Sequence, residues 1–262
     1  MKTVSRIILL GLLSVFLLAG TAMALPVNPR PVPGLTNLGA LQTFLDSQGQ
    51  TINVYNDQRG AALWTTGVAN NSQFSIMLEA AAWAGTSKLG IYNSDDPTSQ
   101  FEIFSGGYEP GDSATLHFNV GGFGTLLVDL FDASEFDLLN PAAAHSYSVF
   151  TGVAANNFGF YLDATGAGQP QSQLVFSEDD LNTKNMAQNL VYAGTGISAG
   201  SWWICFEDQA RWISSDSDFT DFVILAESIN PSPIPEPTTM LLLGAGLIGL
   251  VGVGRTKLFK RG

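Results

Sequence analysis

Residues 202–208 read Trp202-Trp203-Ile204-Cys205-Phe206-Glu207-Asp208, and residues 216–225 read Asp216-Ser217-Asp218-Phe219-Thr220-Asp221-Phe222-Val223-Ile224-Leu225. Each segment contains a short apolar run rich in aromatic and β-branched residues, which predicts two buried strands. Acidic residues fill the interval between the two runs, where Arg211 is the only residue of opposite charge. The carboxylates are those of Glu207, Asp208, Asp216, Asp218 and Asp221.

These carboxylates need either water or a cation, because two such charges about 4 Å apart repel by about 4 kcal/mol at an effective dielectric constant of 20. Ca²⁺ is a suitable cation outside the cell, since it takes about six to eight oxygen ligands. The spacing is not that of an EF-hand: with Asp216 first, Asp221 stands at the position that requires glycine. We therefore predict a calcium site of another type, with acids in solvated turns as the alternative.

The rest of the central chain shows the alternation of a half-buried sheet. Phe74, Ile76 and Leu78 alternate with other residues, as do Leu116, Phe118 and Val120. Further runs of strand type, separated by Gly, Pro, Asn and Asp, span 51–56, 61–65, 88–92, 101–105, 125–131, 146–151, 158–163, 172–177, 189–193, 202–206 and 219–228. Residues 35–48 instead place leucines at helical spacing. We predict an all-β protein, a β-sandwich of jelly-roll type with about a dozen strands and one short N-terminal helix.

Charge is distributed unevenly along the chain. All 23 Asp and Glu lie within residues 25–237, which contain five of the 11 Lys and Arg, so this part carries 5 − 23 = −18 charges. Nucleic acid is therefore not expected as a partner, because phosphate binding needs clustered basic residues. Cys205 is the only cysteine, so no intramolecular disulfide can form, and its apolar neighbours predict a buried small side chain rather than a nucleophile.

The N-terminus has the organisation of a secretory signal peptide. Lys2 and Arg6 precede an apolar run at 7–20, and Ala22-Met23-Ala24 fits a signal-peptidase site with cleavage after Ala24. A permanent N-terminal membrane helix is the alternative, although fourteen apolar residues are fewer than the roughly 20 that a span requires. Four prolines follow and predict a stiff spacer.

The C-terminus contains Pro235-Glu236-Pro237, an apolar run at 240–254 and a final basic cluster. This arrangement resembles the PEP-CTERM sorting signal of exported proteins in Gram-negative bacteria that make extracellular polysaccharide. The resemblance implies cleavage near Pro235, Glu236 and Pro237 by the membrane protease exosortase. Fifteen residues give a helix of about 22 Å against a hydrocarbon core of about 30 Å, which is a marginal span. A plain single-pass anchor is the alternative.

The body resembles a second family. Ser177-Glu178-Asp179-Asp180-Leu181-Asn182, Phe206-Glu207-Asp208 and the acidic run that begins at Asp216 are similar to the S-E-D-x-L-N, F-E-D and D-x-D-F-N-D motifs of an uncharacterised domain of exported bacterial proteins. The family has no settled activity, and the resemblance implies metal binding. The acids at 178–180 are interpreted as a solvated turn.

Two other classes of function have sequence features in their favour. Gly196-Ile197-Ser198-Ala199-Gly200 spells the G-x-S-x-G of a hydrolase, but a strand is expected after it, and both histidines precede Ser198. A glycosidase with paired carboxylates is a further alternative. Trp202, Trp203 and Trp212 could stack on sugars in a calcium-assisted carbohydrate-binding module, although alternation places one of the first two in the core.

We therefore expect an exported, non-enzymatic, calcium-stabilised protein of the outer surface or exopolysaccharide matrix. A carbohydrate-binding module is the second hypothesis and a secreted hydrolase the third. The expected partners are signal peptidase, exosortase, exopolysaccharide and, transiently, the inner membrane. The expected organisation is a signal peptide at 1–24, a spacer at 25–34, a β-sandwich at 35–229, a Pro-rich linker at 230–237 and a transmembrane sorting tail at 238–262.

Overall fold

The computed structural model describes residue 32 and residues 35–66, 71–79, 85–120, 124–168, 173–209 and 215–232. All of them belong to one compact unit, Pro26–Ser232. The predicted signal peptide with Ala24, the processing residues Pro235, Glu236 and Pro237, and the predicted membrane tail lie outside the described residues. Within the described part, no helix is both long and apolar enough to cross a membrane.

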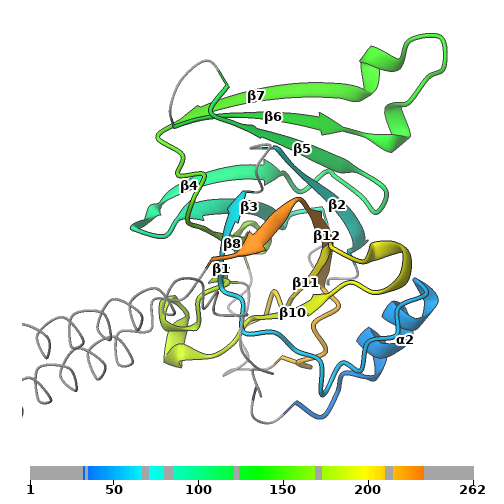
Figure 1. Cartoon of the computed structure of the whole chain (residues 1–262), viewed down its shortest axis with the longest axis vertical. Coiled ribbons are helices and arrows are strands. Elements are labelled where there is room, and N and C mark those ends of the chain that lie inside the picture. Colours follow the sequence, from blue (N-terminus) through cyan, green and yellow to red (C-terminus); the bar gives the residue numbers. More distant parts are fainter. Residues whose placement is uncertain are drawn as a thin grey trace, which may run out of the picture. The chain divides into compact units, whose positions relative to one another are not determined.

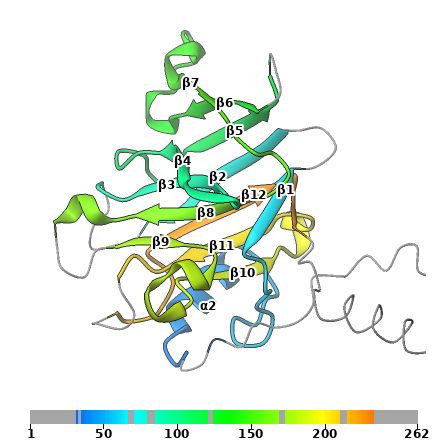
Figure 2. The same ribbon diagram turned by 90° about the vertical axis from the view of Figure 1, so that its left-hand side faces the viewer.

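The described residues form thirteen strands in two antiparallel sheets (Figure 1, Figure 2). The seven-stranded sheet contains, in spatial order, β10 (Asn189–Ala193), β11 (Trp202–Phe206), β12 (Phe222–Glu227), β2 (Asn71–Glu79), β5 (Ser113–Phe118), β6 (Thr125–Phe131) and β7 (His145–Thr151). The six-stranded sheet contains β13 (Ile229–Pro231), β1 (Leu63–Thr66), β8 (Phe158–Asp163), β3 (Lys88–Asn93) and β4 (Asp96–Phe104), with β9 (Leu174–Phe176) paired to β8. The predicted β-sandwich is confirmed.

The main core lies between the two sheets and follows from the alternation in the sequence. In β5 every second residue is buried, as the alternation of Leu116 and Phe118 predicted, and β6 has the same burial pattern. Aromatic rings join the two sheets: Phe74 of β2 packs edge-on against Phe160 of β8 with ring centroids 5.2 Å apart. Phe118 of β5 stacks on Phe158 of β8 at 5.6 Å. These contacts give each sheet one buried face.

A second cluster covers the outer face of the seven-stranded sheet at its β10 end. The helix α2 (Gly39–Ser47) lies within the predicted range 35–48, and Gly49 follows it with a left-handed φ of 71°. Leu41 and Leu45 of the helix are fully buried against residues of β10, β11 and β12. Short 3₁₀ turns complete the fold: η1 (Ala133–Glu135), η2 (Pro141–Ala144), η3 (Thr165–Ala167), η4 (Asp179–Leu181), η5 (Thr183–Asn185) and η6 (Gly196–Ser198).

Two strand predictions are wrong for local reasons. Residues 51–56 form a turn, because the Asn53 side chain accepts hydrogen bonds from the backbone N–H groups of Tyr55 and Asn56, both at 3.1 Å. The strand expected at 219–228 begins only at Phe222, since Phe219 has a left-handed φ of 57° that a strand does not accept.

Candidate metal centre

The pairing of β11 with β12 brings the predicted acidic residues together. The two strands are antiparallel neighbours with Phe206 opposite Phe222. Glu207 and Asp208 directly follow β11, and Asp221 directly precedes β12, so all three lie at the same end of the strand pair. The buried rings of Phe206 and Phe222 fix this end in the main core.

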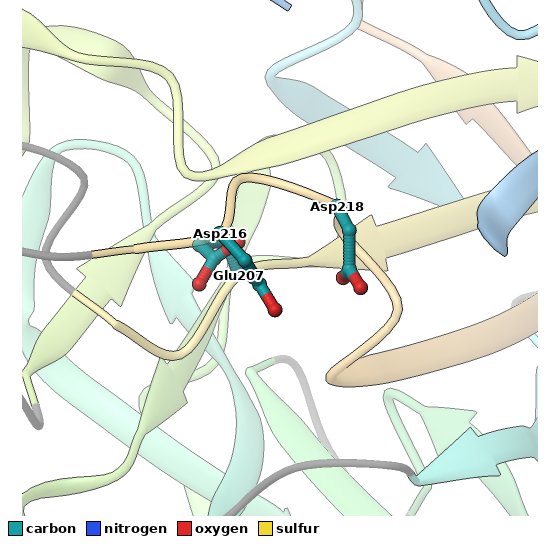
Figure 3. A group of neighbouring side chains, drawn as sticks. All are labelled: Glu207, Asp216 and Asp218. Atoms are coloured by element: carbon teal, nitrogen blue, oxygen red, sulfur yellow. The ribbon is translucent and has the colours of Figure 1, made fainter. Parts of the chain in front are cut away.

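Carboxylate oxygens meet here in two overlapping groups. One oxygen each from Glu207, Asp216 and Asp218 lie within 4.8 Å of one another, and so do oxygens from Glu207, Asp208 and Asp221. Figure 3 shows the side chains of Glu207, Asp216 and Asp218 pointing to the same side of the loop that joins β11 to β12. Glu207 belongs to both groups, so it is the centre of the arrangement. The structure therefore brings all five predicted ligands to one place.

Burial differs strongly among these acids. Glu207 and Asp208 are 0% exposed and Asp221 is buried, whereas Asp216 is exposed and Asp218 is half-buried. Within the described residues, neither carboxylate oxygen of Glu207 has a hydrogen-bond partner of standard geometry, although the Asp221 carboxyl and the Ser215 hydroxyl lie close enough to affect its pKa. A buried carboxylate without such a partner is costly, so this group is the clearest sign of a missing ligand.

The pKa shifts of the buried acids agree with the close approach of their carboxylates. Burial, with the nearby charges of Asp221 and Asp216, raises the pKa of Glu207 to about 9, and the neighbouring Ser215 hydroxyl opposes this rise only in part. Burial also raises the pKa of Asp221, although the backbone N–H of Asp208 donates to its Oδ2 at 2.9 Å. Both shifts favour protonation in the absence of a cation, and a bound cation would reverse that preference.

The loop before β12 is held in a tight conformation. Ser217 and Phe219 both have left-handed φ values, 55° and 57°, which non-glycine residues adopt at a cost. The carboxylate of Asp218 accepts hydrogen bonds from the Thr220 N–H at 2.9 Å and the Thr220 hydroxyl at 2.7 Å. Asp218 therefore both stabilises the turn and faces the acidic cluster.

The same loop connects the cluster to the N-terminal helix. Phe219 is fully buried in the second cluster together with Leu38, Leu41 and Leu45. The Asn37 side chain donates to the backbone carbonyl of Asp216 at 3.1 Å. The sequence indicated that Phe219 anchors the backbone beside the acids, but it placed this residue in a strand and did not indicate its contact with the helix. An aromatic residue between acids was the available signal, but its helical partner could not be read from spacing.

The S-E-D-x-L-N segment, residues 177–182, is hydrogen-bonded to the backbone of β8 and β9. Ser177 accepts a hydrogen bond from the Phe160 N–H at 3.0 Å, and the Asn182 amide bonds both backbone groups of Phe176 at 2.8 Å. Asp180 is exposed, as expected for a solvated turn, but Glu178 is half-buried and accepts a hydrogen bond from Tyr92 at 2.9 Å. The solvated-turn interpretation is therefore wrong for Glu178.

Ser198, Trp202 and Trp203, which suggested other functions, take part in hydrogen bonding or packing within the fold. Ser198 ends η6 with 8% exposure and accepts a hydrogen bond from Gln50 Nε2 at 3.2 Å, and the next regular element is β11. Trp203 is buried under α2, and Trp202 packs against Trp64 at 5.3 Å, which confirms that the pair supplies core residues. Trp212 lies outside the described residues. Cys205 is fully buried, and burial raises the pKa of its thiol.

Comparison with known proteins identifies the C-terminal segment. The family model described as the PEP-CTERM protein-sorting motif matches residues 233–255, which include Pro235-Glu236-Pro237 and the apolar run. No curated protein and no solved structure matches the chain. The sequence-based recognition of the sorting signal is thereby confirmed. The chain carries a PEP-CTERM signal, which indicates an exported protein that exosortase sorts through the membrane to the cell surface.

Proposed function

We propose that the chain is a non-enzymatic protein of the outer surface or exopolysaccharide matrix whose β-sandwich is stabilised by one calcium ion. The ligands are drawn from Glu207, Asp208, Asp216, Asp218 and Asp221. The observation that carries the proposal is the fully buried carboxylate of Glu207, which lacks a hydrogen-bond partner of ordinary geometry and lies within reach of the other four acids.

The chemistry of the cluster favours calcium over other metals. Every residue in it offers only carboxylate oxygens, which hard cations prefer, and neither His nor Cys takes part. Zinc sites in proteins are built chiefly from those two residue types. Magnesium demands near-octahedral geometry and retains several waters, whereas calcium accepts many oxygens in irregular arrangements. The exposed side of the cluster, at Asp216, leaves room for water ligands.

The proposed ion would stabilise more than its own ligands. It would join the ends of β11 and β12 to the loop whose Phe219 ring packs in the α2 cluster. Because Cys205 is the only cysteine, no internal disulfide can serve the same purpose in an oxidising compartment. Calcium would thus take the stabilising role that disulfides take in many exported domains.

Calcium titration of the exported protein tests the metal site. At a hundredfold excess over the Kd, binding adds about 2.7 kcal/mol of stability. For a domain of this size, that raises the melting temperature by about 5 to 11 °C relative to EDTA. The variant Asp218→Asn should reduce this rise, whereas Asp95→Asn, which alters an exposed acid in the turn between β3 and β4, should preserve it. Equal melting of the parent in calcium and EDTA contradicts the proposal.

Intact-mass analysis of surface material tests the processing. We expect a mature chain that starts at Leu25 and ends between Pro235 and Pro237. A mature chain that retains all residues through Gly262 would show that the C-terminal segment is a permanent anchor.

A further inference from the structure

A row of four aromatic rings lies on the outer face of β6 and β7. Phe131 of β6 is the register partner of His145 of β7, and their ring centroids are 5.3 Å apart. Phe136, in the connection after η1, extends the row on one side with its centroid 5.9 Å from that of Phe131. Tyr147 extends it on the other side, stacked on His145 at 6.3 Å with an interplanar angle of 15°.

The two ends of the row are open to solvent, whereas Phe131 and His145 between them are half-buried. Tyr147 is 64% exposed and Phe136 is 47% exposed. The helix α2 packs on β10, β11 and β12, whereas β7 is the strand at the opposite edge of the same sheet (Figure 1, Figure 2). Single exposed aromatic residues are ordinary, but exposed rings joined by half-buried ones on a sheet face mark a candidate interaction site.

Polar groups lie beside the rings. The Nδ1 of His145 is 2.8 Å from Oδ1 of Asp129, and both side chains are partly exposed. Asp129 is the register partner of Tyr147 on β7 and of Thr115 on β5, so it lies between a ring and a hydroxyl-bearing residue. Flat aromatic faces next to a carboxylate and hydroxyls suit a ligand that has an apolar face and a rim of hydroxyl groups. A pyranose ring has this chemistry, because its C–H groups stack on the aromatic face and its hydroxyls donate to carboxylates.

Charge restricts the class of sugar. The strands β5, β6 and β7 contain neither Lys nor Arg, and residues 25–237 carry a net charge of −18. An acidic polysaccharide would be repelled from such a surface, whereas a neutral one would not. We propose that the outer face of β6 and β7 binds a neutral polysaccharide, with Tyr147 as the stacking platform and the Asp129–His145 pair as the hydrogen-bonding group.

This face is distinct from the tryptophan site expected from the sequence. Trp203 is buried in the second cluster, and Trp202 is partly buried against the main core. The rings that are available to a ligand come instead from Phe136, His145 and Tyr147. The proposal does not depend on the calcium site, because no residue of the acidic cluster belongs to this face.

Affinity electrophoresis of the mature exported protein tests the proposal. The native gels contain dextran, galactomannan or hydroxyethyl cellulose as neutral probes, or alginate as the acidic control. We expect retarded migration with at least one neutral probe and none with alginate. Tyr147→Ala should weaken binding at least tenfold, Tyr147→Phe should retain most of it, and Asp129→Asn should weaken it. The matched control is Val149→Ala, since Val149 is 66% exposed on the same face of β7 and has no ring.

Three results would overturn the proposal: unretarded migration with every neutral probe, equal retardation of Tyr147→Ala and the parent, or equal losses in Tyr147→Ala and Val149→Ala. Sedimentation distinguishes the other occupant of this face, a second copy of the chain. A dimer that Tyr147→Ala converts to a monomer without changing migration in the polysaccharide gels would assign the face to self-association instead. Melting curves of each variant show whether the fold is preserved.

Discussion

Replacing Glu207 by Gln should lower stability with calcium but not without it. Without metal, the folded state holds Glu207 with a pKa raised from 4.5 to about 9. A carboxyl whose pKa is raised by folding does not destabilise the folded state below about pH 4.5, where it is protonated in both states. Above that pH it lowers the free energy of unfolding, increasingly so as the pH rises toward its pKa in the folded state. At pH 7 that cost is about 3 kcal/mol, since each pH unit above 4.5 contributes about 1.4 kcal/mol.

The substitution Glu207→Gln removes this ionisation cost but leaves a buried amide, which costs about 1 to 3 kcal/mol if it finds no partner. In EDTA the variant should therefore be equal to the parent or up to about 2 kcal/mol more stable, a rise in melting temperature of about 0 to 8 °C. With calcium the order reverses. The parent gains about 2.7 kcal/mol at a hundredfold excess over the Kd, and the variant loses the ligand shared by both carboxylate groups.

Thermal unfolding followed by circular dichroism at pH 7, in EDTA and in millimolar calcium, measures the effect of the substitution without and with the metal. Asp95→Asn serves as the control for removal of one charge from an exposed position. An equal fall in melting temperature for Glu207→Gln in both conditions would contradict the metal site, because the glutamate would then contribute only through packing.

Two further variants test the surroundings of the site. Phe219→Ala should lower the free energy of unfolding by about 3 to 5 kcal/mol, because it empties a fully buried position between the loop and α2. Hydrogen exchange should then show that α2 loses protection before β5 and β6. Uniform loss of protection would contradict this link between the loop and the helix. Ser198→Ala should lower the free energy of unfolding by only about 0.5 to 1.5 kcal/mol through the lost hydrogen bond from Gln50, and any hydrolytic activity of the exported protein that disappears with it would restore the serine-hydrolase hypothesis.

The sequence predicts the sheet well where side chains alternate cleanly. Leu116 and Phe118 of the alternating pattern lie in β5 and are buried as expected, whereas Val120, the third residue of that pattern, follows the strand and is 47% exposed. Prediction is poorest where a side chain competes for the backbone or where φ is positive. Asn53 turns an apparent strand into a loop, and Phe219 delays the start of β12. Both effects depend on one residue, so a periodicity averaged over a window does not detect them.

The proximity of the acids follows from the sequence, but their individual burial does not. Acids that end one strand and begin its antiparallel neighbour must meet at one end of the sheet, which places Glu207 near Asp221. Whether a given carboxylate faces water depends on elements far away in the chain, so nothing local distinguishes the buried Glu207 from the exposed Asp216. The aromatic row was not predicted either, because its rings come from two strands and the connection between them.

The two proposed sites use different parts of one sheet and should act independently of each other. The acidic cluster lies at the end of β11 and β12, whereas Tyr147 lies on the edge strand β7, with β2, β5 and β6 between them. Those intervening strands contribute buried residues to the main core, which holds their positions without help from the metal. Removing calcium should therefore lower the melting temperature while leaving polysaccharide binding intact at temperatures where the sandwich stays folded. Coupling between the sites would require a two-state element that both ligands bias. The loop that carries Phe219 contacts α2, on the β10 end of the sheet, so a change in its conformation reaches the helix before it reaches β7.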